Sequence, residues 1–232
     1  MSAAEFMKRR AVEIALGGRY SLASRYDAYG NRREFACRTS RISPFEMLVS
    51  VPVLGPVGER VISYFGDFGS LDGRISDVVD GGFLLNIELP RERREKFAGQ
   101  LTWLAKHQHE RAIETRHQKR IVPKSPHSTL IFADGETLNC LVIDVSPSGV
   151  AVSADAKPDI GVRLAVGRTA GTVVRQFQEG FAIAFDRLQD PSNLELILIP
   201  PADVSDYTQG VPRSDGALRA APRPDMLRGI RL

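Results

Sequence analysis

The chain has 232 residues, of which 43% are hydrophobic and 25% are charged, and its formal net charge is +3. This composition is typical of a soluble globular protein with one large or two small domains. The charge balance is too even for a nucleic-acid-binding stripe, and no apolar run approaches the roughly 18–20 residues of a membrane helix. The start of the chain lacks the apolar core of a secretory signal. We therefore expect a cytoplasmic protein with no membrane span.

Two copies of one pattern run through the chain. An offset of 103 residues joins the following pairs: Cys37 to Cys140, Ser43-Pro44 to Ser146-Pro147, Gly58 to Gly161 and Arg60 to Arg163. An offset of 98 residues joins the later pairs, Gly73 to Gly171 and Gly82-Phe83 to Gly180-Phe181. Self-similarity over this length predicts two tandem domains of the same fold, with a five-residue deletion in the second. The two cysteines are too few for a disulfide framework or a zinc site.

The first copy is expected at residues 19–90, after an N-terminal extension at 1–18. Short runs rich in Val, Ile, Leu and Phe predict strands at residues 34–39, 46–51, 60–65, 71–79 and 82–89. Turn signals such as Asp80-Gly81 separate them. The copy is therefore predicted to be mainly β.

A linker helix is expected at residues 91–115. Pro90 suits the first turn of a helix, and Phe97, Leu101 and Leu104 recur at three- and four-residue steps. This spacing predicts an amphipathic helix that packs on a barrel or on a second chain. The only tryptophan, Trp103, is expected to join that packing.

The second copy is expected at residues 116–200, followed by a flexible tail at 201–232 that is rich in Pro, Gly, Asp and Arg. Strands are predicted at residues 128–132, 137–145, 149–153, 163–166, 171–177 and 180–186. Six short strands at close spacing favour a small closed barrel, because closure removes exposed strand edges. The predicted fold is thus mainly β, with two tandem six-stranded barrels joined by a helix.

Five residues near the start of the second copy have a chemistry that suits a guanine nucleotide. Arg116 and Arg120 are four residues apart, and a guanidinium binds phosphate oxygens or the O6/N7 edge of guanine in bidentate fashion. Asp144 can accept hydrogen bonds from a base N–H, and Ser146 can serve either kind of group. Gly149 lets the backbone approach a ligand closely or adopt a positive φ.

At these residues the chain resembles the PilZ family, the bacterial receptor domains for cyclic di-GMP. The family motif is RxxxR followed by (D/N)xSxxG at a strand end, and Arg116, Arg120, Asp144, Ser146 and Gly149 fill all five positions. The resemblance implies six-stranded barrels and a receptor for cyclic di-GMP, and no cofactor is expected. It also implies that the two arginines bind phosphate and guanine, and that Asp144 and Ser146 reach the second guanine or a phosphate.

The first copy lacks this motif. With the offset of 103 residues, Asp144 corresponds to Arg41 and Gly149 to Glu46, whereas the two arginines correspond to Glu13 and Gly17. Glutamates repel a dianionic ligand, and glycine has no guanidinium. We expect the first copy to be degenerate and to bind no ligand.

Three other functions are weighed against the receptor. The alternative is a protein–protein adaptor with a vestigial ligand site, and a protein partner is expected for a receptor as well. Nucleic acid is not expected as a partner, since binding it calls for interleaved basic and aromatic residues on one strand face. Catalysis is not expected either, because none of the four histidines lies in a metal-binding pattern and no P-loop or nucleophile elbow is present.

Overall fold

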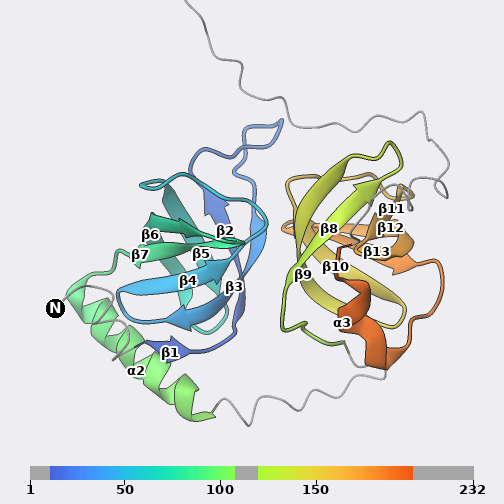
Figure 1. Ribbon diagram of the computed structural model, residues 1–232. Coiled ribbons are helices and arrows are strands. Elements are labelled where there is room, and N and C mark those ends of the chain that lie inside the picture. The colour runs from blue at the N-terminus through green and yellow to red at the C-terminus, as the bar shows by residue number, and fades with distance from the viewer. Residues whose placement is uncertain (1–10, 108–119, 201–232) are drawn as a thin grey trace, which may run out of the picture.

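The computed structural model describes residues 11–107 and 120–200, which fold into two β-barrels that stand side by side (Figure 1). In the first barrel six antiparallel strands close in the order β3-β2-β5-β6-β7-β4, and β1 (Val12–Glu13) pairs with the outer edge of β3. Its strands are β2 (Gly17–Leu22), β3 (Phe35–Ile42), β4 (Glu46–Ser50), β5 (Arg60–Phe65), β6 (Gly69–Val79) and β7 (Gly82–Ile87).

The second barrel is also closed, in the order β10-β13-β12-β11-β8-β9. Its strands are β8 (His127–Phe132), β9 (Thr137–Ser146), β10 (Gly149–Ala154), β11 (Arg163–Val166), β12 (Thr169–Phe177) and β13 (Gly180–Phe185). A short segment, η2 (Pro191–Asn193) with α3 (Leu194–Ile197), follows and buries Leu194 against the barrel core. The predicted fold of two six-stranded barrels is confirmed.

Alternation of side chains explains why these segments form barrel strands. In β5, Val61, Ser63 and Phe65 are buried while the residues between them face outward. In β13, Phe181 and Ile183 point into the core of the second barrel. Each barrel therefore has its own apolar core, as period-two patterning requires.

One strand of the first barrel was not predicted. β2 (Gly17–Leu22) begins with Gly-Gly-Arg, which shows no apolar alternation, and only its last three residues are buried. Its place in the barrel depends on Tyr20, whose ring lies 5.7 Å from the rings of Phe35 and Phe83. β2 begins two residues before the expected start of the first copy, and β1 lies within the expected extension.

Within the predicted helix of residues 91–115, the structure describes α2 (Arg91–His107), which packs along the first barrel (Figure 1). Residues 108–115 of that prediction and the predicted tail at 201–232 lie outside the described residues. Phe97, Leu101 and Leu104 are each 2–3% exposed and join the core of that barrel. These side chains thus pack within the chain and not on a second chain. The prediction for Trp103 is wrong, since its side chain is 55% exposed. A residue next to Leu104 in sequence points about 100° away from it around the helix.

The two barrels match one another down to their irregularities. Ser40 is the extra residue of a bulge in β3, and Ile143 is the extra residue of a bulge in β9. These two residues are 103 positions apart, which is the offset between the copies. The offset of 98 residues carries the bulge at Ser76 in β6 to the bulge at Val174 in β12. β-bulges are specific features of a fold, so these matches confirm the internal repeat in the structure.

The repeated glycines lie where a neighbouring strand leaves no room for a side chain. A Cβ atom on Gly180 would lie 2.0 Å from the carbonyl oxygen of Val152, and one on Gly82 would lie 2.2 Å from that of Val49. Both obstacles are backbone atoms of an adjacent strand. The glycines of the Gly-Phe pairs are therefore required by close approach of strands.

We expect Gly180→Ala to lower the free energy of unfolding by at least about 2 kcal/mol, because the strands must separate to admit the methyl group. Gly82→Ala should do the same to the first barrel. Urea denaturation followed by circular dichroism measures both. Gly66→Ala is the control, since no atom lies within 4 Å of its added Cβ, and its change should stay within about 0.5 kcal/mol. Equal stability of Gly180→Ala and the parent protein would contradict this account.

The barrels contact each other through β3 of the first and β9 and β10 of the second. Ser153 of β10 is fully buried there. Its hydroxyl accepts a hydrogen bond from the Ala36 amide at 3.0 Å and donates one to the Glu179 carbonyl at 2.5 Å. Beyond the end of β10, Asp155 forms ion pairs with Arg33 and Arg25. Buried polar groups that are satisfied across the contact define the relative placement of the barrels.

Candidate ligand-binding site

The hairpin of β9 and β10 holds three of the five motif residues. β9 ends at Ser146, Pro147 and Ser148 form a two-residue turn, and β10 begins at Gly149. The Ser146 hydroxyl donates to the Gly149 carbonyl at 3.2 Å and lies 3.3 Å from the Ser148 hydroxyl oxygen. Ser146 is 8% exposed. Its hydroxyl therefore stabilises the turn, which is one of the two roles that a serine can have there.

Gly149 is needed for the close approach of strands and not for a left-handed backbone. It is absent from the glycines with positive φ. A Cβ on Gly149 would lie 2.5 Å from the carbonyl oxygen of Ile183 in β13. The sequence suggested close approach to a ligand or a positive φ. The structure excludes the positive φ and adds a reason that was not predicted, the close packing of β10 against β13.

Arg120 and Asp144 lie together. The Arg120 Nη1 atom is 3.2 Å from one Asp144 carboxylate oxygen and 3.3 Å from the other. The next residue, Ile121, forms a two-way bridge with Val145, with N···O distances of 2.8 and 2.9 Å. This bridge aligns the end of the RxxxR segment with the end of β9. Arg116 lies outside the described residues.

A surface of small side chains lies beside Asp144 on the outer face of the barrel. Gly149 and Ala151 of β10 pair with Ala184 and Ala182 of β13. Their sequence neighbours in both strands point into the core, so these four residues lie on the outer face of the strands, where Ala151 is only 6% exposed. We call this surface the small-residue floor.

The floor has an acidic and a basic edge. Asp144 pairs with Ala151 on one side, and Arg175 of β12 pairs with Ala182 on the other. Three strand spacings, roughly 14 Å, separate these two strands. The floor was missed from the sequence, although the alternation of Phe, Ala, Ile and Ala in β13 predicts small residues on its outer face.

The corresponding place in the first barrel has different chemistry. Arg41 occupies the position of Asp144, as predicted, and Phe45 occupies the turn position of Ser148. Phe45 is 40% exposed and lies under the Arg94 guanidinium of α2, 4.7 Å from ring centre to carbon. A groove of about 500 Å³ between this turn and α2 is lined by apolar side chains such as Val12 and Leu101 and by charged side chains of α2.

The expected counterparts of the two motif arginines need correction. Val12 bridges to Ile42 as Ile121 bridges to Val145, so Arg120 corresponds to Ala11 and not to Gly17. The two copies are therefore offset by more than 103 residues before Cys37. The reason is that the first copy has a longer connection between β2 and β3, residues 23–34, than the second copy has between β8 and β9, residues 133–136. The corrected position still has no guanidinium.

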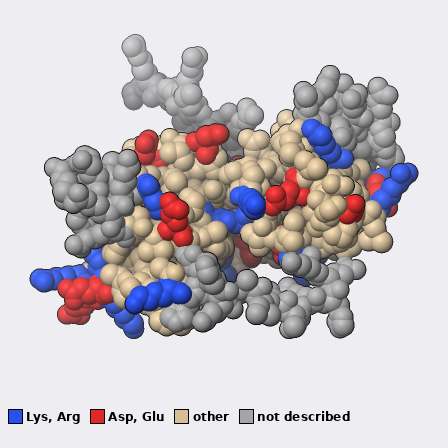
Figure 2. Space-filling model, turned by 60° about the horizontal axis from the view of Figure 1, so that its bottom comes forward, with Lys and Arg blue, Asp and Glu red and all other residues tan. Residues whose placement is uncertain are grey.

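Charges on the described surface are mixed. On the face shown in Figure 2, acidic and basic side chains are interspersed and form no single basic stripe. Residues 11–107 and 120–200 contain no group of three or more side chains suited to a metal ion. In the same part of the chain, every helix is too short or too polar to span a membrane.

Comparison with known proteins assigns the second barrel to a family. Residues 114–198 match the model of the PilZ domain, and this stretch contains all five motif positions. The second barrel therefore belongs to the PilZ domain family, as the motif predicts. None of the curated proteins compared with the chain is a significant match.

Several solved structures are similar to the chain over most of its length. The PlzA protein of Borreliella burgdorferi in complex with c-di-GMP is 11% identical, with a TM-score of 0.29, and the match covers 84% of this chain and 94% of that chain. YcgR from Escherichia coli in complex with c-di-GMP is 13% identical, with a TM-score of 0.26 and coverage of 82% and 92%. Bacillus subtilis MotI/DgrA, an inhibitor of motility, is 16% identical, with a TM-score of 0.26 and coverage of 81% and 94%.

Proposed function

We propose that the protein is a receptor for cyclic di-GMP and that the ligand lies on the small-residue floor of the second barrel. The observation that carries this proposal is the position of the floor. It adjoins Asp144 and the Ser146–Gly149 turn in a barrel of the PilZ family. Planar guanine bases pack well on a surface without long side chains, and the motif residues surround that surface with donors and acceptors.

The ion pair between Arg120 and Asp144 suggests that both side chains change their hydrogen-bond partners when the ligand binds. A phosphodiester of the ligand has two non-bridging oxygens, as many as the Asp144 carboxylate, so it can accept the guanidinium in the same bidentate fashion. Arg120 then transfers to the ligand, and the freed Asp144 carboxylate accepts from a guanine N–H. Arg116 supplies a second guanidinium, Ser146 a hydroxyl, and Gly149 a backbone without a side chain.

The expected affinity follows from these contacts. A hydrogen bond to a charged group contributes about 1.5–3 kcal/mol. Three or four of them, less the entropy of ordering the arginine segment, are consistent with a dissociation constant of about 1 μM, or roughly 8 kcal/mol.

Calorimetric titration with cyclic di-GMP, GTP and a short oligonucleotide tests the proposal directly. Saturable binding of cyclic di-GMP alone supports the receptor. Absence of binding by the folded chain would contradict it and favour the adaptor. Binding of the oligonucleotide in place of cyclic di-GMP would assign the barrel to nucleic acid.

A bulky side chain on the floor should block the ligand without disturbing the core. We expect Ala182→Trp to weaken binding of cyclic di-GMP at least about tenfold, or about 1.4 kcal/mol, because the indole fills the space of a base. The matched control is Ala133→Trp in the turn between β8 and β9, at the other end of β9. Normal binding by Ala182→Trp would place the ligand elsewhere on the barrel.

A further inference from the structure

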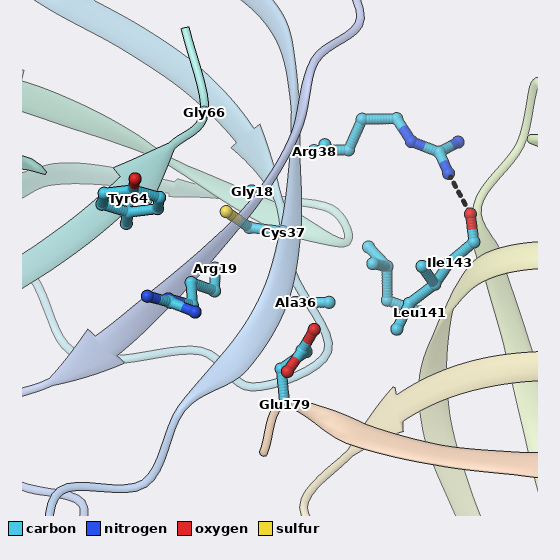
Figure 3. Close-up of a pocket in the computed structure, with 11 residues that line it drawn as sticks. Gly18, Arg19, Ala36, Cys37, Arg38, Tyr64, Gly66, Leu141, Ile143 and Glu179 are labelled. Carbon is cyan, nitrogen blue, oxygen red and sulfur yellow. Dashed lines mark hydrogen bonds between the residues drawn. The ribbon is translucent and has the colours of Figure 1, made fainter. Parts of the chain in front are cut away.

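One side chain of the first barrel reaches directly into the backbone of the second. Arg38 of β3 donates from Nη1 to the Pro123 carbonyl at 2.7 Å and from Nη2 to the Val142 and Ile143 carbonyls at 3.1 and 3.3 Å. Figure 3 shows its side chain extending from the first barrel toward Ile143 of the second. Arg38 is only 8% exposed, so this cation is held by carbonyl oxygens away from water.

The first acceptor belongs to the segment that carries Arg120. Arg120 contacts Asp144, Ile121 bridges to Val145, and Pro123 accepts from Arg38. These three contacts fasten residues 120–123 along the end of β9. Arg38 supplies the last of them from outside the barrel.

The other two acceptors lie at the bulge next to Asp144. Ile143 is the extra residue of β9, which the ladder with β10 leaves unpaired. A bulge bends the strand and redirects the adjacent side chain. The Arg38 guanidinium binds the carbonyls of Val142 and Ile143, so it holds the bend from which Asp144 projects.

We propose that Arg38 is a positioning residue of the ligand site: the first barrel uses it to hold both backbone segments that carry Arg120 and Asp144. This inference rests on the proposed function for its effect on ligand affinity. Arg38 touches neither ligand-binding side chain and acts only through the main chain. The degenerate barrel thereby contributes to binding without a site of its own.

The geometry calls for arginine. A guanidinium has five N–H donors in a planar fork and can span several carbonyls. Lysine offers one ammonium on a flexible stem. The offset of 103 residues places Leu141 at the matching position of the second barrel, so the cation is a feature of the first copy only.

The test compares Arg38→Met and Arg38→Lys with the parent protein as full-length chains. We expect Arg38→Met to weaken cyclic di-GMP binding about tenfold in calorimetry, and Arg38→Lys to recover part of the loss. Hydrogen exchange without ligand provides a second measurement. The amides of Ile121 and Val145, which form the bridge, should exchange faster in Arg38→Met.

Arg33→Gln is the matched control. This change removes an ion pair from the same contact between the barrels. However, Asp155, the partner of Arg33, follows the far end of β10 and lies six residues after Gly149, a distance of roughly 20 Å. The affinity of Arg33→Gln for cyclic di-GMP and the rate of hydrogen exchange at its Ile121 amide should equal those of the parent protein. Equal loss in Arg33→Gln and Arg38→Met would show that docking of the barrels in general, and not Arg38, sets affinity.

The outcomes separate this inference from the proposed function. A parent protein that does not bind cyclic di-GMP refutes the proposed function, and exchange at Ile121 and Val145 still tests the positioning. Parent-like affinity of Arg38→Met overturns the inference while leaving the receptor intact. If Arg38→Met does not fold, Arg38→Lys retains the charge and decides the question by the same two measurements.

Discussion

Replacing either Arg116 or Arg120 by alanine should weaken binding of cyclic di-GMP at least about tenfold, and replacing both should weaken it further. Each change removes a charge-assisted contact of about 1.5–3 kcal/mol, and 1.4 kcal/mol is a factor of ten. Calorimetry or equilibrium dialysis measures the loss. Folding should be unaffected, since Arg120 is exposed and pairs only with the partly exposed Asp144 among the contacts that the structure describes.

The control for this prediction is Arg168→Ala. Arg168 is an exposed arginine in the turn between β11 and β12, and the strand order places this turn on the opposite side of the barrel from β9 and β10. Its removal changes the net charge by the same amount as each motif variant. A comparable loss in Arg168→Ala would show that general attraction of the anion, and not the motif, accounts for binding.

A fragment of residues 1–110 should show no saturable binding of cyclic di-GMP. It contains the whole first barrel with α2, whose Phe97, Leu101 and Leu104 complete its core, so we expect it to fold. Arg41 stands in place of the acceptor Asp144, and Phe45 fills the corresponding turn. Thermal unfolding of the fragment establishes that it is folded before the titration.

The complementary fragment, residues 111–200, should bind more weakly than the full chain. It retains the motif and the floor, but it lacks Arg38 and exposes Leu141 and Ser153, which the first barrel buries. Saturable binding by the N-terminal fragment would show that its degenerate site is still active. Full-strength binding by the C-terminal fragment would conflict with a contribution from the first barrel.

The strands with clear alternation could be predicted almost to the residue. β5 begins and ends where the pattern places it, because a strand with one buried face must alternate apolar and outward residues. β11 also has its predicted bounds, although it was recognised as a short apolar run and its last three residues are all buried. β2 could not be predicted, because its glycines and arginine lack that pattern and its pairing depends on contacts with β3 and β5. Trp103 shows the reverse case, a large apolar side chain that helix geometry leaves exposed.

Sequence by itself determined the family of the second barrel, the two copies and the motif, because turn glycines, strand alternation and guanidinium spacing are local properties of the chain. The tertiary structure alone decided which surfaces meet. Strand pairing showed that Ala11 corresponds to Arg120. The packing of the strands placed Ala182 and Ala151 next to Asp144. The contact between the barrels brought Arg38 to main-chain carbonyls of the second barrel. These relations join residues up to about a hundred positions apart, and no local pattern encodes which strands pair or which barrel faces pack.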